Sequence, residues 1–473
     1  MTGFNEYLEM DDFCAWIDCY LNFEKTPKKN IFWLETMKFL CGKLGNPEQK
    51  SRCFHVAGSK GKGSVSAMIS SVLDEMGFFT GVYSSPHIEH FLERVQSADG
   101  PFENHVYEQA AENVMSCVEK WKDLLPEGRP LTWFELVTVF AMECYALAKC
   151  DWAVYEVGLG GRLDATNVVM PECCCISAIE KEHTEYLGDT VEKIAFEKGG
   201  IIKKGVPVVI GRQQFEGARR VLENCARERG APVVDAESLC KISEVVYNSR
   251  QCNSTVPTSS SKVVYKITQS DGFGMFFTLS SPLFSRPLHP NLKLLGEFQA
   301  HNAAVAALAV KTVFPDASED LIEKGLSKAS IPGRFEILQD ISRYSGLEAL
   351  VLDGAHTISS VTFTMQTFEK LFSGKKAVLL FGCAADKDVQ HMAPLFKERF
   401  DGVFVTKPGE VKACSLNGMD FAFSDSGIPH QTISETAYAI ETALSCAMEK
   451  GAVLLVTGSF YLVSEVKKYL HKK

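Results

Sequence analysis

Short apolar runs rich in β-forming residues alternate with helix-length stretches over residues 50–235, and this rhythm limits the possible folds more than any other feature of the chain. Strands that alternate with helices in this way form a parallel sheet with crossover helices. The rhythm therefore predicts an α/β fold. The expected strands are Cys53–Ala57, Gly81–Ser84, Trp152–Val157, Cys173–Ile179 and Val206–Ile210.

The same rhythm returns after Gly296, so a second, smaller α/β domain is expected. A chain of 473 residues is too long for one comfortable core, which also favours two domains. We predict an N-terminal domain over 1–295, with an inserted β-rich segment at about 236–290, and a C-terminal domain over 296–473. The insertion is marked by the turn-rich stretch Ser254–Ser261 and by strand-like runs at Lys262–Thr268 and Gly274–Leu279. The later strands are expected at Ala349–Leu352, Ala377–Phe381, Gly402–Val405 and Val453–Val456.

Charge and composition exclude several classes of protein. The net charge of −10 and the pI near 5.7 disfavour a nucleic-acid partner, whose phosphates call for a basic face. The N-terminus lacks the pattern of a signal peptide, and no run approaches the roughly 18 apolar residues of a membrane span. The sixteen cysteines are scattered and are expected to be reduced thiols. A soluble cytoplasmic protein without a membrane partner is expected.

A glycine-rich turn lies between the first expected strand and its helix, in His55-Val-Ala-Gly-Ser-Lys-Gly-Lys-Gly-Ser64. Backbone N–H groups of such a turn can surround phosphate oxygens, and Lys62 can reach the terminal phosphates. The turn departs from the usual phosphate-loop template, because Val56 stands at the first glycine position and Gly63 follows the lysine. It could instead be an ordinary glycine-rich turn between a strand and a helix. Further lysines that could meet anionic ligands are Lys60, Lys198, Lys203 and Lys204.

A series of motifs resembles one known family. Gly58-Ser-Lys-Gly-Lys-Gly-Ser64 is similar to the phosphate loop of folylpolyglutamate synthases, and further matches follow in the family's order from Asn22 to Leu462. The chain thus resembles the folylpolyglutamate synthase and dihydrofolate synthase branch of the Mur ligase superfamily. The strongest of the further matches are Ser84-Ser-Pro-His87, Leu131-Thr-Trp-Phe-Glu135, Glu156-Val-Gly-Leu-Gly-Gly-Arg-Leu-Asp-Ala-Thr-Asn167, His183-Thr-Glu-Tyr-Leu-Gly188, Pro332-Gly-Arg334 and Asp353-Gly-Ala-His356.

The resemblance implies a P-loop-type ATP-binding domain followed by a Rossmann-like glutamate-ligase domain. It also implies an ATP-dependent amide ligase that adds L-glutamate to dihydropteroate, to folate polyglutamates or to both, through an acyl phosphate. We predict both activities. The implied partners are the small molecules ATP, L-glutamate and a pterin or folate, with Mg²⁺ as cofactor and the protein acting as a monomer.

The same resemblance assigns roles to individual residues. Catalytic roles fall on Lys62, Lys198 and Arg334, with Lys198 carrying a carbamate formed with carbon dioxide. Magnesium contacts fall on Ser85, Glu156 and His183. Substrate contacts fall on Thr132, Leu163, Asp164 and Ala165. ATP contacts fall on Gly58, Ser59, Lys60, Gly61, Lys62, Gly63, Ser64, Asn302, Arg334, Asp353 and His356.

Several of these residues could also have a purely structural role. Glu156 stands at the end of an apolar strand, where a carboxylate faces a ligand crevice, but it could instead pair with Arg162. Arg334 suits a phosphoryl group in flight, but it could form a surface ion pair with Glu336. His183 could be a hydrogen-bonding loop residue, Lys198 an exposed helical residue, and the nearby Phe134 a core aromatic.

Several positions depart from the family pattern. These departures affect the predicted substrate preference more than the predicted ATP-dependent reaction. One rival interpretation is a Mur-type ligase that joins a different carboxylate to a different amino acid. A second is a non-catalytic nucleotide-binding protein that has kept the fold. The departures are Ser59 and Lys60 in the loop, Glu182 before His183, Gly199 after Lys198, and Thr357 after His356.

Overall fold

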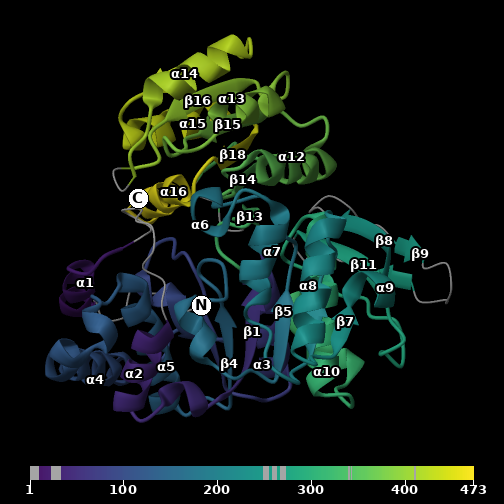
Figure 1. Cartoon of the computed structure of the whole chain (residues 1–473). Coiled ribbons are helices and arrows are strands. Elements are labelled where there is room, and N and C mark those ends of the chain that lie inside the picture. The colour runs from purple at the N-terminus through teal and green to yellow at the C-terminus, as the bar shows by residue number, and fades with distance from the viewer. Residues whose placement is uncertain are drawn as a thin grey trace. The chain divides into compact units, whose positions relative to one another are not determined.

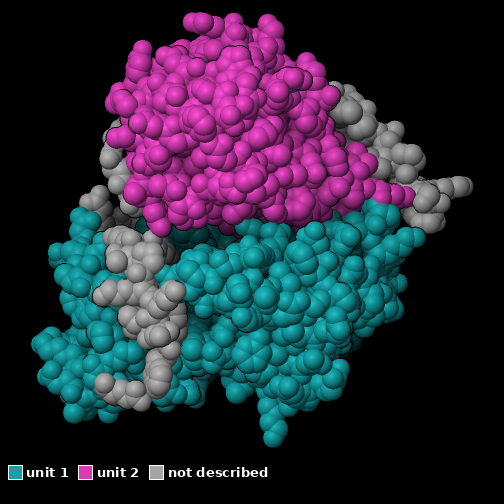
Figure 2. Space-filling view, turned by 45° about the horizontal axis from the view of Figure 1, so that its top comes forward, with its two compact units in different colours: residues 1–243, 278–290, 299–329 teal, residues 244–277, 291–298, 330–473 magenta. Residues whose placement is uncertain are grey.

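The computed structural model forms two compact units (Figures 1 and 2). The first contains residues 1–243, 278–290 and 299–329, and the second contains residues 244–277, 291–298 and 330–473. Parts of the expected runs Ser254–Ser261 and Lys262–Thr268 lie outside the described residues, as do residues 23–33 after Asn22, where the matches to the family begin. The structure describes residues 10–22, 34–248, 255–257, 264–266, 273–338, 341, 344–409 and 412–472.

The first unit contains a mainly parallel sheet with the strand order β3-β2-β4-β1-β5-β6-β7. Only β3 runs antiparallel to its neighbour among these described strands. All five strands expected before residue 235 are present, so this part of the prediction is confirmed. The strands are β1 (Arg52–Ala57), β2 (Thr80–Tyr83), β3 (Val95–Ser97), β4 (Trp152–Glu156), β5 (Cys173–Ile176), β6 (Val208–Ile210) and β7 (Val233–Asp235).

Helices of the first unit cover this sheet (Figure 1). Helix α5 is apolar on all sides, and its residues 136–145 are buried, as expected for a helix inside a core. Helix α3 ends at Glu75, and Gly77 follows with a φ of 87°, a left-handed conformation that commonly terminates helices. The helices are α1 (Asp11–Asp18), α2 (Leu34–Lys43), α3 (Lys62–Glu75), α4 (Asn104–Trp121), α5 (Trp133–Ala148), α6 (Thr184–Leu187), α7 (Val191–Gly199), α8 (Glu216–Glu228) and α9 (Ala236–Leu239).

Most of α10 (Glu297–Val313) and all of α11 (Glu319–Lys328) belong to the first unit, so the division differs from the single expected boundary at residue 296. Helix α11 packs closely on α3 because Gly325 has no side chain. A Cβ at Gly325 would lie 2.4 Å from the Cα of Val72. Lys328 also forms ion pairs from α11 to Asp74 and Asp99. These contacts join residues 299–329 to the preceding sheet rather than to the following one.

The expected inserted segment is β-rich. Three of its strands form a sheet in the order β12-β11-β8, in which β11 and β12 pair antiparallel, and β9 pairs antiparallel with β10. Residues 244–277 belong to the second unit, whereas the insertion was expected within the N-terminal domain. The strands are β8 (Lys241–Asn248), β9 (Thr255–Pro257), β10 (Val264–Lys266), β11 (Gly274–Ser280) and β12 (Asn291–Leu292).

The second unit contains a sheet with the order β13-β14-β18-β15-β16-β17, and β13 runs antiparallel to β14. The remaining pairings among these described strands are parallel, which confirms the expected α/β character. The elements are β13 (Glu336–Ile337), β14 (Ala349–Leu352), α12 (Ile358–Phe372), β15 (Ala377–Phe381), α13 (Val389–Met392), β16 (Gly402–Thr406), α14 (Leu416–Asp425), β17 (Gln431–Ile433), α15 (Thr436–Lys450), β18 (Val453–Thr457) and α16 (Phe460–Lys472).

In the part of the chain that the structure describes, no helix is both long enough and apolar enough to cross a bilayer.

Candidate active site

The expected phosphate loop connects β1 to the start of α3, as the sequence predicted. Its backbone is held against the segment after β5, because the N–H groups of Ser59 and Lys60 both donate to the Ala178 carbonyl. Gly58 has a φ of 146°, and a Cβ there would lie 1.9 Å from Ser177 Oγ. The loop therefore needs glycine at this position. The first N–H groups of α3 have no acceptors within the helix. They can therefore donate to an anion bound at this turn.

Asn302 lies against this loop. A Cβ at Gly61 would be 2.4 Å from Asn302 Oδ1, so the carboxamide occupies the space that any other residue at position 61 would need. Gln299 orients the carboxamide by accepting a hydrogen bond of 2.8 Å from Asn302 Nδ2. The structure thus brings a residue of α10 to the loop within the first unit. Gln299 is a supporting residue that the sequence analysis missed, although it stands one helical turn before Asn302.

Two lysine ammonium groups donate hydrogen bonds to the same carbonyl, that of Gly58 at the start of the loop. Lys62 Nζ donates to the Gly58 oxygen over 3.1 Å, and Lys198 Nζ donates to it over 2.8 Å. Lys198 is buried, with 2% of its side chain exposed, and its ammonium group also lies 2.9 Å from the Glu182 carboxylate. The exposed helical position considered for Lys198 is therefore wrong. The sequence marked Glu182 only as a departure from the family pattern and did not reveal it as the partner of Lys198.

Burial and neighbouring charges shift the pKa values of this pair. Burial lowers the pKa of Lys198 to about 8; the Glu182 charge opposes this shift and the Lys62 charge adds to it. Burial would raise the pKa of Glu182, but the charges of Lys198 and Lys62 bring it down to about 2. The pKa of His183 is lowered, chiefly by burial; the Glu182 charge opposes this shift and the two lysine charges add to it. A neutral imidazole next to two cations can act as a ligand or as a hydrogen-bonding group.

Glu156 and Ser85 meet at the carboxyl ends of two neighbouring strands. Glu156 ends β4, Ser85 follows β2, and the Ser85 N–H donates to Glu156 Oε2 over 3.1 Å. The Glu156 side chain is buried. Arg162, considered as an alternative partner of Glu156, forms an ion pair with Glu197 over 2.9 Å.

The residues at these strand ends suit magnesium, whose coordination can be completed by phosphates and waters. They do not suit a metal that needs all its ligands from the protein. Within the described ranges, no three His, Cys, Asp or Glu side chains gather closely enough to hold a metal ion by themselves. Magnesium is commonly held by one or two carboxylates and completed by phosphates and waters. The buried carboxylate of Glu156, next to the backbone of Ser85, fits that kind of site.

Thr132 has a structural role that the sequence analysis overlooked. Its hydroxyl accepts from the Glu135 N–H, while the Glu135 carboxylate accepts from the Thr132 N–H and hydroxyl. This is a capping box that starts α5, and Arg129 forms an ion pair with the same carboxylate. The spacing Thr-x-x-Glu before an apolar run was the signal for it.

Asp164 shapes the loop that follows β4. Its carboxylate accepts hydrogen bonds from the N–H groups of Gly158 and Leu159 and from the N–H and hydroxyl groups of Thr166. Thr166 in turn bonds to the buried His55 of β1 over 2.9 Å. Burial raises the pKa of Asp164, although these donors oppose the shift. The carboxylate therefore fixes the loop that presents its neighbours Leu163 and Ala165.

Phe134 packs against the same loop. A Cβ at Gly158 would lie 2.3 Å from the ring, and the ring centroid is 5.9 Å from that of Tyr83. Phe134 is only partly buried, so it borders the core rather than lying within it.

The remaining predicted ATP residues lie together in the second unit, in the turn before β13 and the loop after β14. The Asp353 carboxylate accepts from the N–H groups of Phe335 and Ala355 and from the Thr364 hydroxyl, so it fixes the turn that carries Arg334. Burial raises the pKa of Asp353, and the charge of Arg334 acts in the opposite direction.

Arg334 and His356 share an aromatic neighbour. The Arg334 guanidinium carbon lies 4.4 Å from the centroid of Phe460, and the His356 ring centroid lies 6.0 Å from it. The Glu336 carboxylate, considered as a partner of Arg334, accepts from the Gly333 N–H and forms an ion pair with Lys467. Phe460 is not marked by any of the motifs described above, and it stands at the start of α16.

Of the further lysines considered for anionic ligands, Lys203 is engaged elsewhere. Lys203 donates to the backbone and side-chain oxygens of Asn167 over 2.7 and 2.8 Å. Lys204 is exposed.

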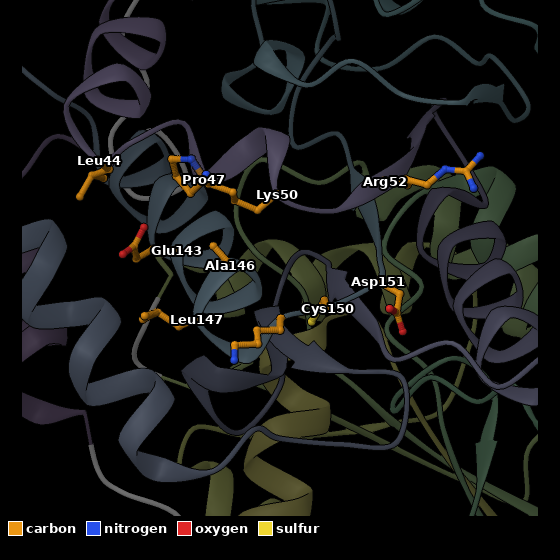
Figure 3. Close-up of a pocket in the computed structure, with 10 residues that line it drawn as sticks. Leu44, Pro47, Lys50, Arg52, Glu143, Ala146, Leu147, Cys150 and Asp151 are labelled. Carbon is orange, nitrogen blue, oxygen red and sulfur yellow. The ribbon is translucent and has the colours of Figure 1, made fainter.

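A cavity of about 630 Å³ lies at the opposite edge of the first sheet (Figure 3). Its lining includes Lys50, Arg52, Glu143 and Asp151. Arg52 begins β1 and Asp151 precedes β4, whereas the phosphate loop follows the end of β1. This cavity is therefore distinct from the candidate active site.

Comparison with known proteins places the whole chain in one family. Residues 333–460 match the family model of the Mur ligase, glutamate ligase domain. The chain is 30% identical over 461 residues to dihydrofolate synthase/folylpolyglutamate synthase of Bacillus subtilis, with 96% of this chain and 98% of that protein covered. It is 29% identical over 433 residues to folylpolyglutamate synthase of Lacticaseibacillus casei, with 90% and 92% covered.

Solved structures agree with these sequence matches. The crystal structure of folylpolyglutamate synthase from Thermotoga maritima aligns with a TM-score of 0.79 and 27% identity, covering 97% of this chain and 96% of that one. The resemblance seen in the motifs is thus confirmed over nearly the whole length. The chain belongs to the dihydrofolate synthase/folylpolyglutamate synthase family.

Proposed function

We propose that this chain is an ATP-dependent ligase that adds L-glutamate both to dihydropteroate and to folate polyglutamates. The phosphate loop carries the proposal, because it places Lys62 and the start of α3 at the end of β1. The chain that carries this loop aligns over 96% of its length with dihydrofolate synthase/folylpolyglutamate synthase of Bacillus subtilis.

The chemistry requires activation of a carboxylate. A carboxylate oxygen attacks the γ-phosphorus of ATP and displaces ADP, which gives an acyl phosphate. The amino group of glutamate then attacks the acyl carbon, the tetrahedral intermediate expels phosphate, and the nitrogen loses a proton to form the amide. The protein must hold both reactants in line and supply positive charge to the transferring phosphoryl group.

We propose the nucleotide roles separately for each unit, with its geometry as support. We assign binding of the phosphates to the backbone of Gly58–Ser64 and to Lys62, with Asn302 packed on Gly61. In the second unit, Arg334 and His356 are assigned to the nucleotide, and Arg334 is assigned to the phosphoryl group in flight. Asp353 supports this role by fixing the turn that carries Arg334.

We assign Mg²⁺ to Glu156 and Ser85, with His183 as a further ligand. When bound, the ion would neutralise charge on the phosphates. The protein residues prepare this site by burying Glu156 and orienting it through the Ser85 N–H.

We also propose a carbamate on Lys198, formed when its neutral amine adds to carbon dioxide and loses a proton. The burial that lowers the pKa of Lys198 to about 8 favours the neutral amine. The ion pair with Glu182 opposes the reaction, because a carbamate would place a second anion beside this carboxylate. Lys198 can therefore carry the carbamate only if Glu182 moves away from it.

For the pterin substrate, the proposed contacts are Leu163 and Ala165 together with the start of α5 at Thr132. The side chains of Thr132 and Asp164 have the structural roles described above, so they contribute by shaping the backbone around the substrate. We further propose that the enzyme acts as a monomer in the cytoplasm, in keeping with the free thiols of its described cysteines.

The direct test measures ADP release by the purified protein with ATP, magnesium and glutamate, with and without dihydropteroate. The proposal predicts ADP release that depends on the pterin and is lost in Lys62→Ala. A protein that binds ATP tightly but releases no ADP with any acceptor would instead be the non-catalytic rival. Release that depends on another carboxylate would indicate a Mur-type ligase of different specificity.

A further inference from the structure

We propose that Phe460 is a positioning residue whose ring fixes the orientation of the Arg334 guanidinium group and the His356 imidazole. This inference rests on the proposed function, because it takes both side chains to meet the nucleotide. All three residues lie in the second unit, where the turn before β13, the loop after β14 and the start of α16 come together.

The contact with Arg334 is the central observation. The guanidinium carbon lies 4.4 Å from the ring centroid, within the roughly 6 Å over which a cation is attracted to an aromatic face. A guanidinium group that stacks by its flat face keeps its N–H donors in its own plane, where they suit the paired oxygens of a phosphoryl group. A lysine at position 334 would lack this flat face.

His356 approaches the same ring edge-on. The two ring centroids are 6.0 Å apart with an angle of 66° between the planes. The His356 ring is also held by a 2.7 Å contact between Nδ1 and the Gly354 carbonyl oxygen. One aromatic ring thus restricts both side chains that are assigned to the nucleotide.

The Phe460 ring is itself held firmly. A Cβ at Gly354 would lie 2.3 Å from the ring, so the backbone of the loop after β14 packs directly on the ring. The same loop is tied to the end of β18 by a 2.9 Å hydrogen bond from the Gly458 N–H to the Ala355 carbonyl.

Phe460 is only partly buried, unlike the core phenylalanines of this unit, such as Phe381. Its position is therefore better explained by the side chains that it supports than by burial of apolar surface.

The test compares Phe460→Leu, which removes the aromatic face, with Phe460→Trp, which retains it. Phe421→Leu is the matched control, since Phe421 lies in α14 of the same unit with 60% exposure. We expect Phe460→Leu to lower kcat by about 3- to 30-fold, with the KM for ATP changing less than about threefold. Phe460→Trp and Phe421→Leu should stay within about threefold of the unchanged enzyme.

A double-mutant cycle separates positioning from a general effect on folding. In an Arg334→Lys background, Phe460→Leu should lower kcat by a smaller factor than in the unchanged enzyme, because the guanidinium group is already absent and only the orientation of His356 remains to be lost. If Phe460→Leu lowers the melting temperature, Phe460→Met repeats the comparison with another apolar side chain that lacks an aromatic face.

Equal loss of kcat in both backgrounds would overturn the inference, as would a Phe460→Leu enzyme that matches Phe421→Leu. If the unchanged protein shows no pterin-dependent ADP release, the proposed function fails first. If it is active and Phe460→Leu has no effect, the inference alone fails.

Discussion

The Lys198 ammonium group lies 2.9 Å from the Glu182 carboxylate at the foot of the phosphate loop, and its second hydrogen bond runs to the Gly58 carbonyl. A buried charge is costly without a partner, so Glu182 stabilises Lys198 as a cation. A carbamate on the same nitrogen would remove the positive charge and leave a single N–H donor for these two acceptors. The pair therefore determines how readily Lys198 can be modified.

The first prediction concerns this modification. Protein equilibrated with ¹³C-bicarbonate should show a carbamate carbon by NMR that is absent from Lys198→Ala. The carbamate population should rise between about pH 7 and pH 9, because the neutral amine increases as the pH passes the Lys198 pKa of about 8. Glu182→Gln should raise the population further by removing the anion. An unmodified lysine over this whole range, in both proteins, would eliminate the carbamate role.

The second prediction concerns the loop lysine. Lys62→Ala should lower turnover by at least about 100-fold, since it removes a positive charge from the transferring phosphoryl group. The melting temperature should change little, because the Lys62 side chain makes its described hydrogen bond within the loop itself. Lys204→Ala, at an exposed lysine, is the matched control. An active Lys62→Ala enzyme would remove the phosphate-loop assignment.

The third prediction uses two glycines with the same backbone angle. Gly61 and Gly77 both have a φ of 87°, but a Cβ at Gly61 would meet Asn302, whereas Gly77 has nothing within 4 Å. Both alanine variants should lose about 1–2 kcal/mol of stability from the left-handed conformation. Only Gly61→Ala should raise the KM for ATP, by about tenfold or more, because it displaces Asn302 from the loop. Equal KM values in the two variants would contradict the proposed role of this contact.

The fourth prediction concerns the pH dependence of stability. Glu319 accepts from the Ser285 N–H and pairs with the buried Lys311 over 2.9 Å. Burial would raise the pKa of Glu319, but these partners lower it from 4.5 to about 2. Because the folded pKa lies below the unfolded one, the stabilisation is complete above pH 4.5 and is lost as the pH falls toward 2. The full shift corresponds to about 3 kcal/mol, and screening by solvent reduces the stabilisation below that value.

Denaturant unfolding of the unchanged protein and of Glu319→Gln at pH 7 and pH 3.5 measures this effect. At pH 7 the unchanged protein should have a larger free energy of unfolding than Glu319→Gln. The difference between the two proteins should be smaller at pH 3.5. The exposed Glu112 provides a control, since Glu112→Gln should give the same small difference at both pH values. If the difference in free energy of unfolding between the unchanged protein and Glu319→Gln is the same at both pH values, the predicted linkage is contradicted.

Local patterns in the sequence predicted the parallel strands and the phosphate loop, because both are encoded within short segments. The division of the two units was not predictable in this way. It depends on Gly325 packing on Val72, a contact between helices far apart in the sequence. No local pattern records such a contact.

The candidate site shows the same limit. Motifs identified Glu156 and Ser85, which meet because neighbouring parallel strands end at one edge. They did not reveal that Glu182 pairs with Lys198, because this pairing depends on how the loop after β5 folds against helix α7. The capping role of Thr132 was encoded locally by Thr-x-x-Glu and was overlooked in favour of a substrate contact.

The most direct test of the central claim is the mass of the product formed with ATP, magnesium and glutamate from dihydropteroate and from tetrahydrofolate, with ADP counted in parallel. The account predicts that both pterins gain glutamate, with one ADP released for each residue added. Addition to only one pterin would contradict the proposed dual activity. ADP release without any glutamate-bearing product, or no pterin-dependent ADP at all, would contradict the proposed ligase function itself.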